Sequence, residues 1–256
     1  MKITVCQLHD DPGRFAADWE ALVDHVQSAK SDLVLLPELP FCSWFATTQS
    51  FDPNVWQAVI DDHHAWMPCL PELGSTHVLG TRPVNDGETR LNVGFAWDGD
   101  AGCRDVHAKY YLPEEPGFWE TAWYQRGEKV FTPVQCGPAR VGFMICSELW
   151  FLEHARHYGQ AGANIIAVPR ATMKASLDRW MLAGRVAAIV GGAFCISSNR
   201  AGIHPAGITF AGRGWIISPD GDVLALTTDE APFVTMEIDL QQAAEAKQTY
   251  PRNVAD

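Results

Sequence analysis

Residues 1–38 read MKITVCQLHDDPGRFAADWEALVDHVQSAKSDLVLLPE, and this stretch predicts a complete strand-helix-strand unit. Residues 3–8 form a mainly apolar run, residues 12–30 carry apolar side chains at helical spacing, and residues 33–36 are apolar at every position. A strand that is apolar on both faces is typical of a sheet covered by helices on each side. The first unit of the chain therefore predicts an α/β fold.

The same alternation of short apolar runs and longer amphipathic segments continues through the chain. Residues 110–137 have no clean period and predict a long loop with at most one helical turn, a type of segment that is often functional. We find no repeat, low-complexity segment or linker, so residues 1–256 predict a single domain. Further helices are expected at residues 53–70, 149–161 and 177–191 and after 238, and further strands at residues 77–82, 91–97, 140–145, 165–168, 193–198, 214–218, 223–227 and 233–238.

The charge balance of the chain argues against nucleic acid and membrane partners. Nineteen Lys and Arg against 31 Asp and Glu give a net charge of −12, which repels phosphate backbones and anionic lipid surfaces. No apolar run approaches the length of a membrane span, and the N-terminus enters a strand without the pattern of a signal peptide. We therefore expect a cytoplasmic protein.

The cysteines and histidines do not predict a metal site. Seven cysteines are widely spaced and include no CxxC pair, so they indicate neither a disulfide framework nor a thiolate zinc site. His154 and His157 lie three residues apart on a predicted helix, but no third ligand follows at a fitting spacing. We interpret both histidines as surface residues and expect no metal.

Three residues with useful chemistry directly follow apolar strands, where α/β proteins place their ligands: Glu38, Cys146 and Arg170. A carboxylate such as Glu38 is costly to bury alone, so it lies either at a rim or in a polar site. Cys146 occupies a strand-to-helix turn, whose N–H groups favour a thiolate, although a small core residue is the alternative. Lys109 directly precedes the predicted loop at residues 110–137, which is rich in aromatic residues and is called the aromatic loop below. Its ammonium would stabilise a nearby carboxylate or oxyanion, unless it is a surface lysine.

Several segments carry these residues in a familiar order. They are residues 35–38 (LLPE), 109–120 (KYYLPEEPGFWE) and 145–156 (ICSELWFLEHAR), followed by the pair at 199–200 (NR) and the turn at 219–222 (PDGD). In order and spacing these segments resemble the nitrilase superfamily of carbon-nitrogen hydrolases. The resemblance covers nearly the whole chain.

The resemblance implies a four-layer αββα sandwich and a Glu-Lys-Cys catalytic triad. Cys146 would be the nucleophile, Glu38 the general base and Lys109 the stabiliser of the tetrahedral intermediate, with Glu120 orienting the lysine or the substrate. The implied reaction is hydrolysis of a small linear amide or N-carbamoyl compound through an acyl-thioenzyme, without metal or organic cofactor. Relatives pair through helices near the cysteine, which implies a homodimer or a higher homo-oligomer.

The residues after Cys146 leave the substrate open. Ser147 and Glu148 replace the aromatic-Asp pair common in the family, and Glu148 is similar to the true nitrilases, so a small nitrile is an alternative substrate. Trp150 resembles the tryptophan of carbamoylputrescine amidases, or it packs into the core. Arg170 has the fork geometry that binds a substrate carboxylate, or it pairs with a carboxylate such as Glu148 or Glu153. Our candidate substrate-binding residues are thus Ser147, Trp150 and Arg170.

A catalytically silent binding protein on the same fold is the alternative from another class. An inactive relative would be free to lose any member of the triad. The presence of Glu38, Lys109 and Cys146 together favours an enzyme.

Overall fold

The computed structural model describes residues 1–254 and confirms the strand-helix-strand unit at the start of the chain. Strand β1 (Lys2–His9) is followed by helix α1 (Pro12–Ala29) and strand β2 (Leu33–Leu35), which pairs in parallel with β1. Helix α1 begins at Pro12 because Asp11 accepts the peptide N–H of Gly13 and proline fits the first turn. One face of α1 is buried against the sheet.

The strands form two sheets that share the end of β1. In the first sheet β1 lies between β2 and β15, and the order from the far edge is β5, β4, β3, β2, β1. The C-terminal end of β1 pairs in parallel with β11, which belongs to the second sheet. The remaining strands of the first sheet are β3 (His77–Asp86), β4 (Thr89–Asp98), β5 (Gly102–Ala108) and β15 (Phe233–Glu237). Those of the second are β8 (Val134–Cys136), β9 (Ala139–Phe143), β10 (Ile165–Arg170), β11 (Phe194–Ile203), β12 (Thr209–Ala211), β13 (Trp215–Ile217) and β14 (Val223–Leu226).

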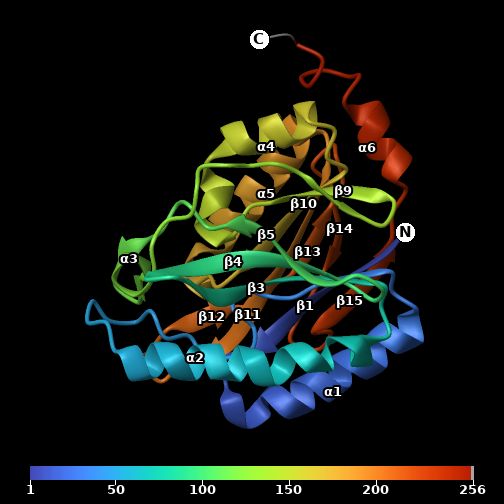
Figure 1. Ribbon diagram of the computed structural model, residues 1–256. Coiled ribbons are helices and arrows are strands. Elements are labelled where there is room, and N and C mark those ends of the chain that lie inside the picture. Colours follow the sequence, from blue (N-terminus) through green and yellow to red (C-terminus); the bar gives the residue numbers. More distant parts are fainter. Residues whose placement is uncertain (255–256) are drawn as a thin grey trace.

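The two sheets face each other across a buried apolar layer, in which Ile3 and Leu35 of the first sheet meet Phe143 and Ile196 of the second. Helices cover the outer faces: α1 and α2 (Pro53–Trp66) lie on one side, and α4 (Leu152–Gln160) and α5 (Leu177–Gly191) on the other (Figure 1). This arrangement confirms the predicted α/β class and the αββα sandwich.

Element boundaries differ from the sequence predictions in several places. The predicted loop at residues 110–137 also contains a hairpin of β6 (Glu114–Glu115) and β7 (Phe118–Trp119), the single turn α3 (Glu120–Trp123), and β8. Strands β5 and β12 were not predicted. Two helices are divided by 3-10 turns, η1 (Met67–Leu73) after α2 and η2 (Cys146–Trp150) before α4. A third such turn, η3 (Lys174–Ser176), precedes α5, and α6 (Leu240–Ala246) follows β15.

The topology brings the ends of four strands together. Strands β9, β10, β11, β1, β2 and β3 pair in this order and are all parallel. Strand β4 is antiparallel to β3, and β5 is antiparallel to β4, so β5 runs in the same direction as β3. The carboxyl ends of β2, β5, β9 and β10 therefore lie at the same edge of the sandwich. Glu38, Lys109, Cys146 and Arg170 stand at or just beyond these ends. Separately, no helix within residues 1–254 is long and apolar enough to cross a lipid bilayer.

Candidate active site

Lys109 is fully buried between two carboxylates. Its Nζ lies 2.7 Å from Oε1 of Glu38, and 2.8 Å and 2.7 Å from Oε1 and Oε2 of Glu120. All three side chains have no exposed surface. Glu120 reaches the lysine because it begins the short helix α3, inside the aromatic loop that Lys109 opens. The structure thus brings together three of the predicted catalytic residues.

The two oxygens of Glu38 have different surroundings. Oε1 accepts hydrogen bonds from Lys109 and from Nδ2 of Asn92, the latter at 2.8 Å. Oε2 is buried and has no hydrogen-bond partner among the described residues. One oxygen therefore fixes the carboxylate, and the other remains available as a proton acceptor.

Asn92 was not predicted from the sequence. It is a buried residue of β4, and its backbone carbonyl accepts the peptide N–H of Lys109 at 2.9 Å. The same residue therefore contacts both Glu38 and Lys109. The available signal was a polar residue inside the otherwise apolar run at 91–97.

Cys146 follows β9 and starts the 3-10 turn η2. Its φ of 48° lies in the left-handed region, which is uncommon for a residue other than glycine and is often found at functional sites. The side chain is buried, and Sγ lies 3.9 Å from the carbonyl oxygen of Ala171, just beyond β10.

The electrostatics of this cluster join Cys146 to the lysine and the two glutamates. Burial raises the pKa of the Cys146 thiol well above its ordinary value; the charge of Glu38 raises it further, and Lys109 opposes this effect. Burial alone would lower the pKa of Lys109, but Glu120 and Glu38 together hold it above its ordinary value. Burial also raises the pKa of Glu120 to about 7, against the attraction of Lys109. The resting site therefore holds a neutral thiol beside a charged lysine.

Arg200 fixes the chain segment that carries Glu38. Its guanidinium donates to the backbone carbonyls of Glu38 at 3.1 Å and Cys42 at 2.8 Å, to the carbonyl of Leu39, and to the carboxylate of Asp10. Leu39 has a φ of 46°, so the chain turns sharply after the glutamate. Arg200, the second residue of the pair noted in the sequence, thus holds the backbone of the segment that carries Glu38.

Arg170 is buried, and its guanidinium donates hydrogen bonds only to uncharged acceptors among the described residues. Nε donates to Oγ of Ser197 at 2.6 Å, Nη1 to Oγ1 of Thr172 at 2.9 Å, and Nη2 to the carbonyl of Arg213 at 2.7 Å. The guanidinium carbon also lies 3.8 Å from the ring centroid of Trp215. Within residues 1–254 no carboxylate forms a salt bridge with Arg170, so the pairing considered from the sequence is not observed.

The other candidate substrate-binding residues lie on η2. Ser147 donates its hydroxyl to the carbonyl of Tyr111. Trp150 is 46% exposed and packs against Trp180 of α5, with ring centroids 4.9 Å apart. It is therefore at the surface rather than in the core.

The interpretation of His154 as a surface residue was wrong, whereas His157 is exposed as expected. His154 is buried, stacks on Phe131 with ring centroids 3.6 Å apart, and its Nε2 lies 3.0 Å from the hydroxyl of Tyr111. The aromatic loop folds back over α4 and covers this face, which helical spacing alone could not reveal. Over residues 1–254 no group of three or more His, Cys, Asp or Glu side chains is arranged to hold a metal ion.

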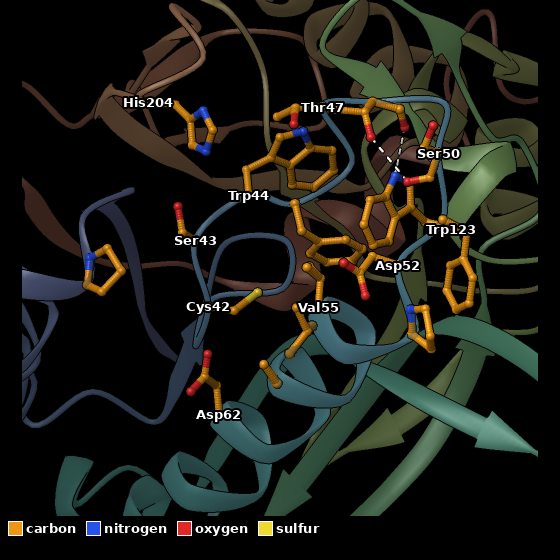
Figure 2. Close-up of a pocket in the computed structure, with 17 residues that line it drawn as sticks. Cys42, Ser43, Trp44, Thr47, Ser50, Asp52, Val55, Asp62, Trp123 and His204 are labelled. Atoms are coloured by element: carbon orange, nitrogen blue, oxygen red, sulfur yellow. Dashed lines mark hydrogen bonds between the residues drawn. The ribbon is translucent and has the colours of Figure 1, made fainter.

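A cavity of about 780 Å³ lies beside the segment that follows Glu38. Figure 2 shows Cys42, Ser43, Trp44 and Thr47 of this segment along one side of it, with Val55 and Asp62 of α2 opposite. Two indoles in the wall are fixed by hydrogen bonds, from Trp44 to the carbonyl of Gly117 and from Trp123 to that of Thr48, each at 2.9 Å. The lysine-glutamate cluster and Cys146 do not line this cavity.

The sandwich and the buried Glu-Lys-Glu cluster beside a cysteine define a protein of the nitrilase-like class. The comparison with protein families agrees: residues 2–248 match the carbon-nitrogen hydrolase family. The chain belongs to this family.

Two curated relatives are amidases. The chain is 26% identical to the chloroplastic omega-amidase of Arabidopsis thaliana over 98% of its own length and 71% of that enzyme. It is 28% identical to the N-carbamoylputrescine amidase of the same plant, over 60% of this chain and 56% of that enzyme, which is little more than half of the relative's length.

Solved structures share the fold. The carbon-nitrogen hydrolase from Helicobacter pylori G27 superposes with a TM-score of 0.87 at 22% identity, covering 99% of this chain and 94% of the other. A mutant amidase from Nesterenkonia sp. AN1 superposes with a TM-score of 0.77 at 19% identity, covering 96% and 92%. In that structure the acetamide moiety of fluoroacetamide is covalently added to the active-site cysteine.

Proposed function

We propose that this protein hydrolyses the C–N bond of a small linear amide or N-carbamoyl compound through an acyl-thioester on Cys146. The observation that carries the proposal is the state of Glu38, with one oxygen bound to Lys109 and Asn92 and the other free in a buried site. A buried thiol whose pKa is raised cannot attack without a base, and Glu38 is such a base.

Acylation begins when Oε2 of Glu38 takes the thiol proton and Sγ of Cys146 forms a bond to the carbonyl carbon. The carbonyl oxygen gains negative charge, which the Lys109 ammonium and the peptide N–H of Ser147 stabilise. When the intermediate collapses, the C–N bond breaks and Glu38 passes its proton to the departing nitrogen. Ammonia or an amine leaves, and a thioester remains.

Deacylation uses the same residues. Glu38 removes a proton from water while the hydroxide oxygen bonds to the thioester carbon. Collapse of the second intermediate breaks the C–S bond, and the proton returns to Sγ of Cys146. Glu120 does not exchange protons in this scheme; its two bonds to Nζ keep Lys109 charged and directed at the reacting carbonyl.

The contacts of the candidate substrate-binding residues support a different role for each of them. Arg170 already donates to three protein acceptors, which supports a role in holding the chain near Ala171 over binding a substrate carboxylate. The hydroxyl of Ser147 is also engaged, so its peptide N–H is the group we assign to the oxyanion. Trp150 is partly exposed close after Cys146, so we propose a direct contact with the substrate for it as the alternative to a contact between subunits.

Two relatives named for amide and carbamoyl substrates favour these classes over a nitrile. Nitrile hydrolysis and a silent binding protein remain the alternatives to be tested. We also propose a homodimer or higher homo-oligomer that pairs through η2 and α5, because both elements expose large apolar side chains.

A substrate panel tests the proposal. Small amides, N-carbamoyl compounds and nitriles are offered to the wild-type protein and to Cys146→Ala, with ammonia, amine and acid products measured. Turnover of amides or carbamoyl compounds by the wild type alone supports the proposal. Turnover of nitriles only would establish the nitrilase alternative, and no turnover of any compound would favour the silent protein.

Alkylation tests the base directly, with an exposed cysteine as internal reference. Iodoacetamide reacts with the thiolate of either cysteine; the exposed Cys103 can lose its proton to solvent, whereas the buried Cys146 depends on a neighbouring base. We expect Glu38→Gln to slow labelling of Cys146 at least about tenfold, since the base is removed, and to leave Cys103 unchanged. Equal labelling of Cys146 in both proteins would contradict the role of Glu38.

A further inference from the structure

Glu148 is a fully buried carboxylate that the mechanism above does not use. Its Oε2 accepts the peptide N–H of Ile145 at 2.7 Å and lies 2.8 Å from Nε2 of His107. Its Oε1 accepts the peptide N–H of Tyr110 at 2.8 Å. Both oxygens are thus engaged, in contrast to those of Glu38.

The partners of Glu148 lie next to the reacting residues. Ile145 directly precedes Cys146, and Tyr110 directly follows Lys109. Lys109 extends from β5 of the first sheet and Cys146 from β9 of the second. One carboxylate therefore connects the two chain segments that carry the lysine and the nucleophile, although they belong to different sheets.

His107 is the side-chain partner of Glu148. It is a residue of β5 whose side chain is 3% exposed, and its Nδ1 faces the carbonyl of Val130 at 3.2 Å. Both ring nitrogens thus face an oxygen atom. A buried carboxylate with two backbone donors and a histidine partner has both oxygens engaged, which fixes its geometry.

We propose that Glu148 and His107 are positioning residues that hold Cys146 at a fixed place relative to Lys109. The proposal rests on the function proposed above, because it assigns these residues to the same reaction. Misplacement of reacting groups by about 1 Å can cost about 100-fold in rate. The pair accordingly contributes to the rate of acylation rather than to substrate affinity.

The test compares Glu148→Gln and His107→Gln with a matched control, His77→Gln. His77 is a buried histidine that pairs with the partly exposed carboxylate of Asp98, with Nδ1 and Oδ2 3.0 Å apart. Asp98 lies six residues along β4 from Asn92, which is about 20 Å at the rise of a strand. The control thus removes a buried histidine with a carboxylate partner from the same sheet, at a distance from the cluster.

We expect Glu148→Gln to lower kcat at least about tenfold per folded active site, with KM within about threefold of the wild type. His107→Gln keeps a neutral donor to Glu148 and is expected to give a smaller loss. His77→Gln is expected to lower Tm with kcat unchanged. The folded fraction is measured by circular dichroism, so that a loss of folded protein is not counted as a loss of rate.

A kcat unchanged in both site variants would overturn the proposal and leave the pair a purely structural role. If Glu148→Gln does not fold, His107→Gln decides alone by the same criterion. If the wild type hydrolyses none of the compounds, the proposed function fails, and the rate of Cys146 alkylation relative to Cys103 replaces kcat. A ratio lowered in the site variants and unchanged in the control then supports the positioning role, and an unchanged ratio in all three overturns it.

Discussion

At the scale of single residues, the distinct roles of the two Glu38 oxygens depend on Asn92. Its side-chain amide donates to Oε1, the oxygen that also binds Lys109, and so turns the carboxylate until Oε2 is free. A hydrogen bond to a charged group contributes about 1.5–3 kcal/mol. Without it the carboxylate can rotate between orientations, only some of which place a free oxygen toward the thiol.

We therefore predict that Asn92→Ala lowers kcat about 10- to 100-fold on the best compound of the panel. Asn164→Ala is the control. The Asn164 side chain also accepts a hydrogen bond, from the peptide N–H of Arg140. Asn164 directly precedes β10, whereas the catalytic cluster lies near the other end of this strand, at Arg170. Steady-state kinetics on the three proteins measure the effect. A kcat for Asn92→Ala within twofold of the wild type would show that Lys109 alone orients Glu38.

Glu120 provides a pH-dependent signature of the buried cluster. Its pKa is raised by burial from 4.5 to about 7 in the folded protein. A carboxyl group that binds its proton more tightly when folded stabilises the protein below the unfolded pKa, and this contribution is lost as the pH rises through the folded pKa. The window is therefore between about pH 4.5 and pH 7.

We predict that the free energy of unfolding of the wild type, minus that of Glu120→Gln, decreases as the pH is raised from 5 to 7. The slope is at most about 1.4 kcal/mol per pH unit, the value for one proton. Urea unfolding at several pH values measures it, and Glu128→Gln, a change of an exposed glutamate, should give a flat difference. A flat or rising difference for Glu120→Gln would show that Lys109 keeps Glu120 ionised throughout this range.

The reacting residues could be predicted because each follows a recognisable strand or begins a distinctive loop. Glu38 and Cys146 interrupt apolar runs, and the family resemblance then connects them to Lys109. Asn92 and His107 could not be assigned in this way, because they lie inside strands and their partners are more than 30 residues away. Only the folded chain shows which polar residues meet.

At the scale of elements, the exposure of β5 explains why the sequence did not predict this strand. Strand β5 is an edge strand whose residues are mostly exposed or partly exposed, so it has no apolar face and no periodic signal. In contrast, β1 and β2 are buried and α1 has one apolar face, and all three were predicted within two residues of their ends. The periodic pattern of apolar residues in a sequence arises where one face of an element is buried. An exposed edge strand buries little surface and therefore gives only a weak pattern.

Helices α4 and α5 approach closely where Gly159 faces Gly191. A Cβ added at Gly159 would lie 2.2 Å from the carbonyl oxygen of Gly191, which is backbone and cannot move aside. We predict that Gly159→Ala destabilises the protein by about 1–3 kcal/mol, the usual range for overpacking, in spite of the better helix propensity of alanine.

Thermal or urea unfolding measures this effect. Gly99→Ala is the control, because a Cβ there would meet only the Trp97 ring at 3.8 Å, an ordinary contact. The control should lie within about 0.5 kcal/mol of the wild type. A similar small value for Gly159→Ala would mean that α4 can shift away from α5 at little cost.

At the scale of the whole molecule, the net charge of −12 makes two copies of the chain repel each other. Self-association therefore requires apolar contacts that outweigh this repulsion. Trp150 on η2 is 46% exposed and Leu182 on α5 is 62% exposed. The two elements are neighbours, since the Trp150 ring lies against Trp180 of α5. A twofold contact through this face would bury such side chains in both copies at once, which makes it our candidate for self-association.

We predict that the wild-type chain elutes with at least twice its monomer mass in size-exclusion chromatography with light scattering, and that Leu182→Glu shifts this mass toward the monomer. The introduced carboxylate would be buried against an apolar surface and would add to an already negative chain. Ile203→Glu is the control, because Ile203 is 74% exposed at the end of β11 and belongs to neither η2 nor α5. If Ile203→Glu dissociates the assembly and Leu182→Glu does not, the contact lies at the end of β11 rather than at η2 and α5. If the wild type is a monomer at every concentration, the exposed side chains on η2 and α5 serve no self-association, and a substrate contact for Trp150 becomes the better explanation of its exposure.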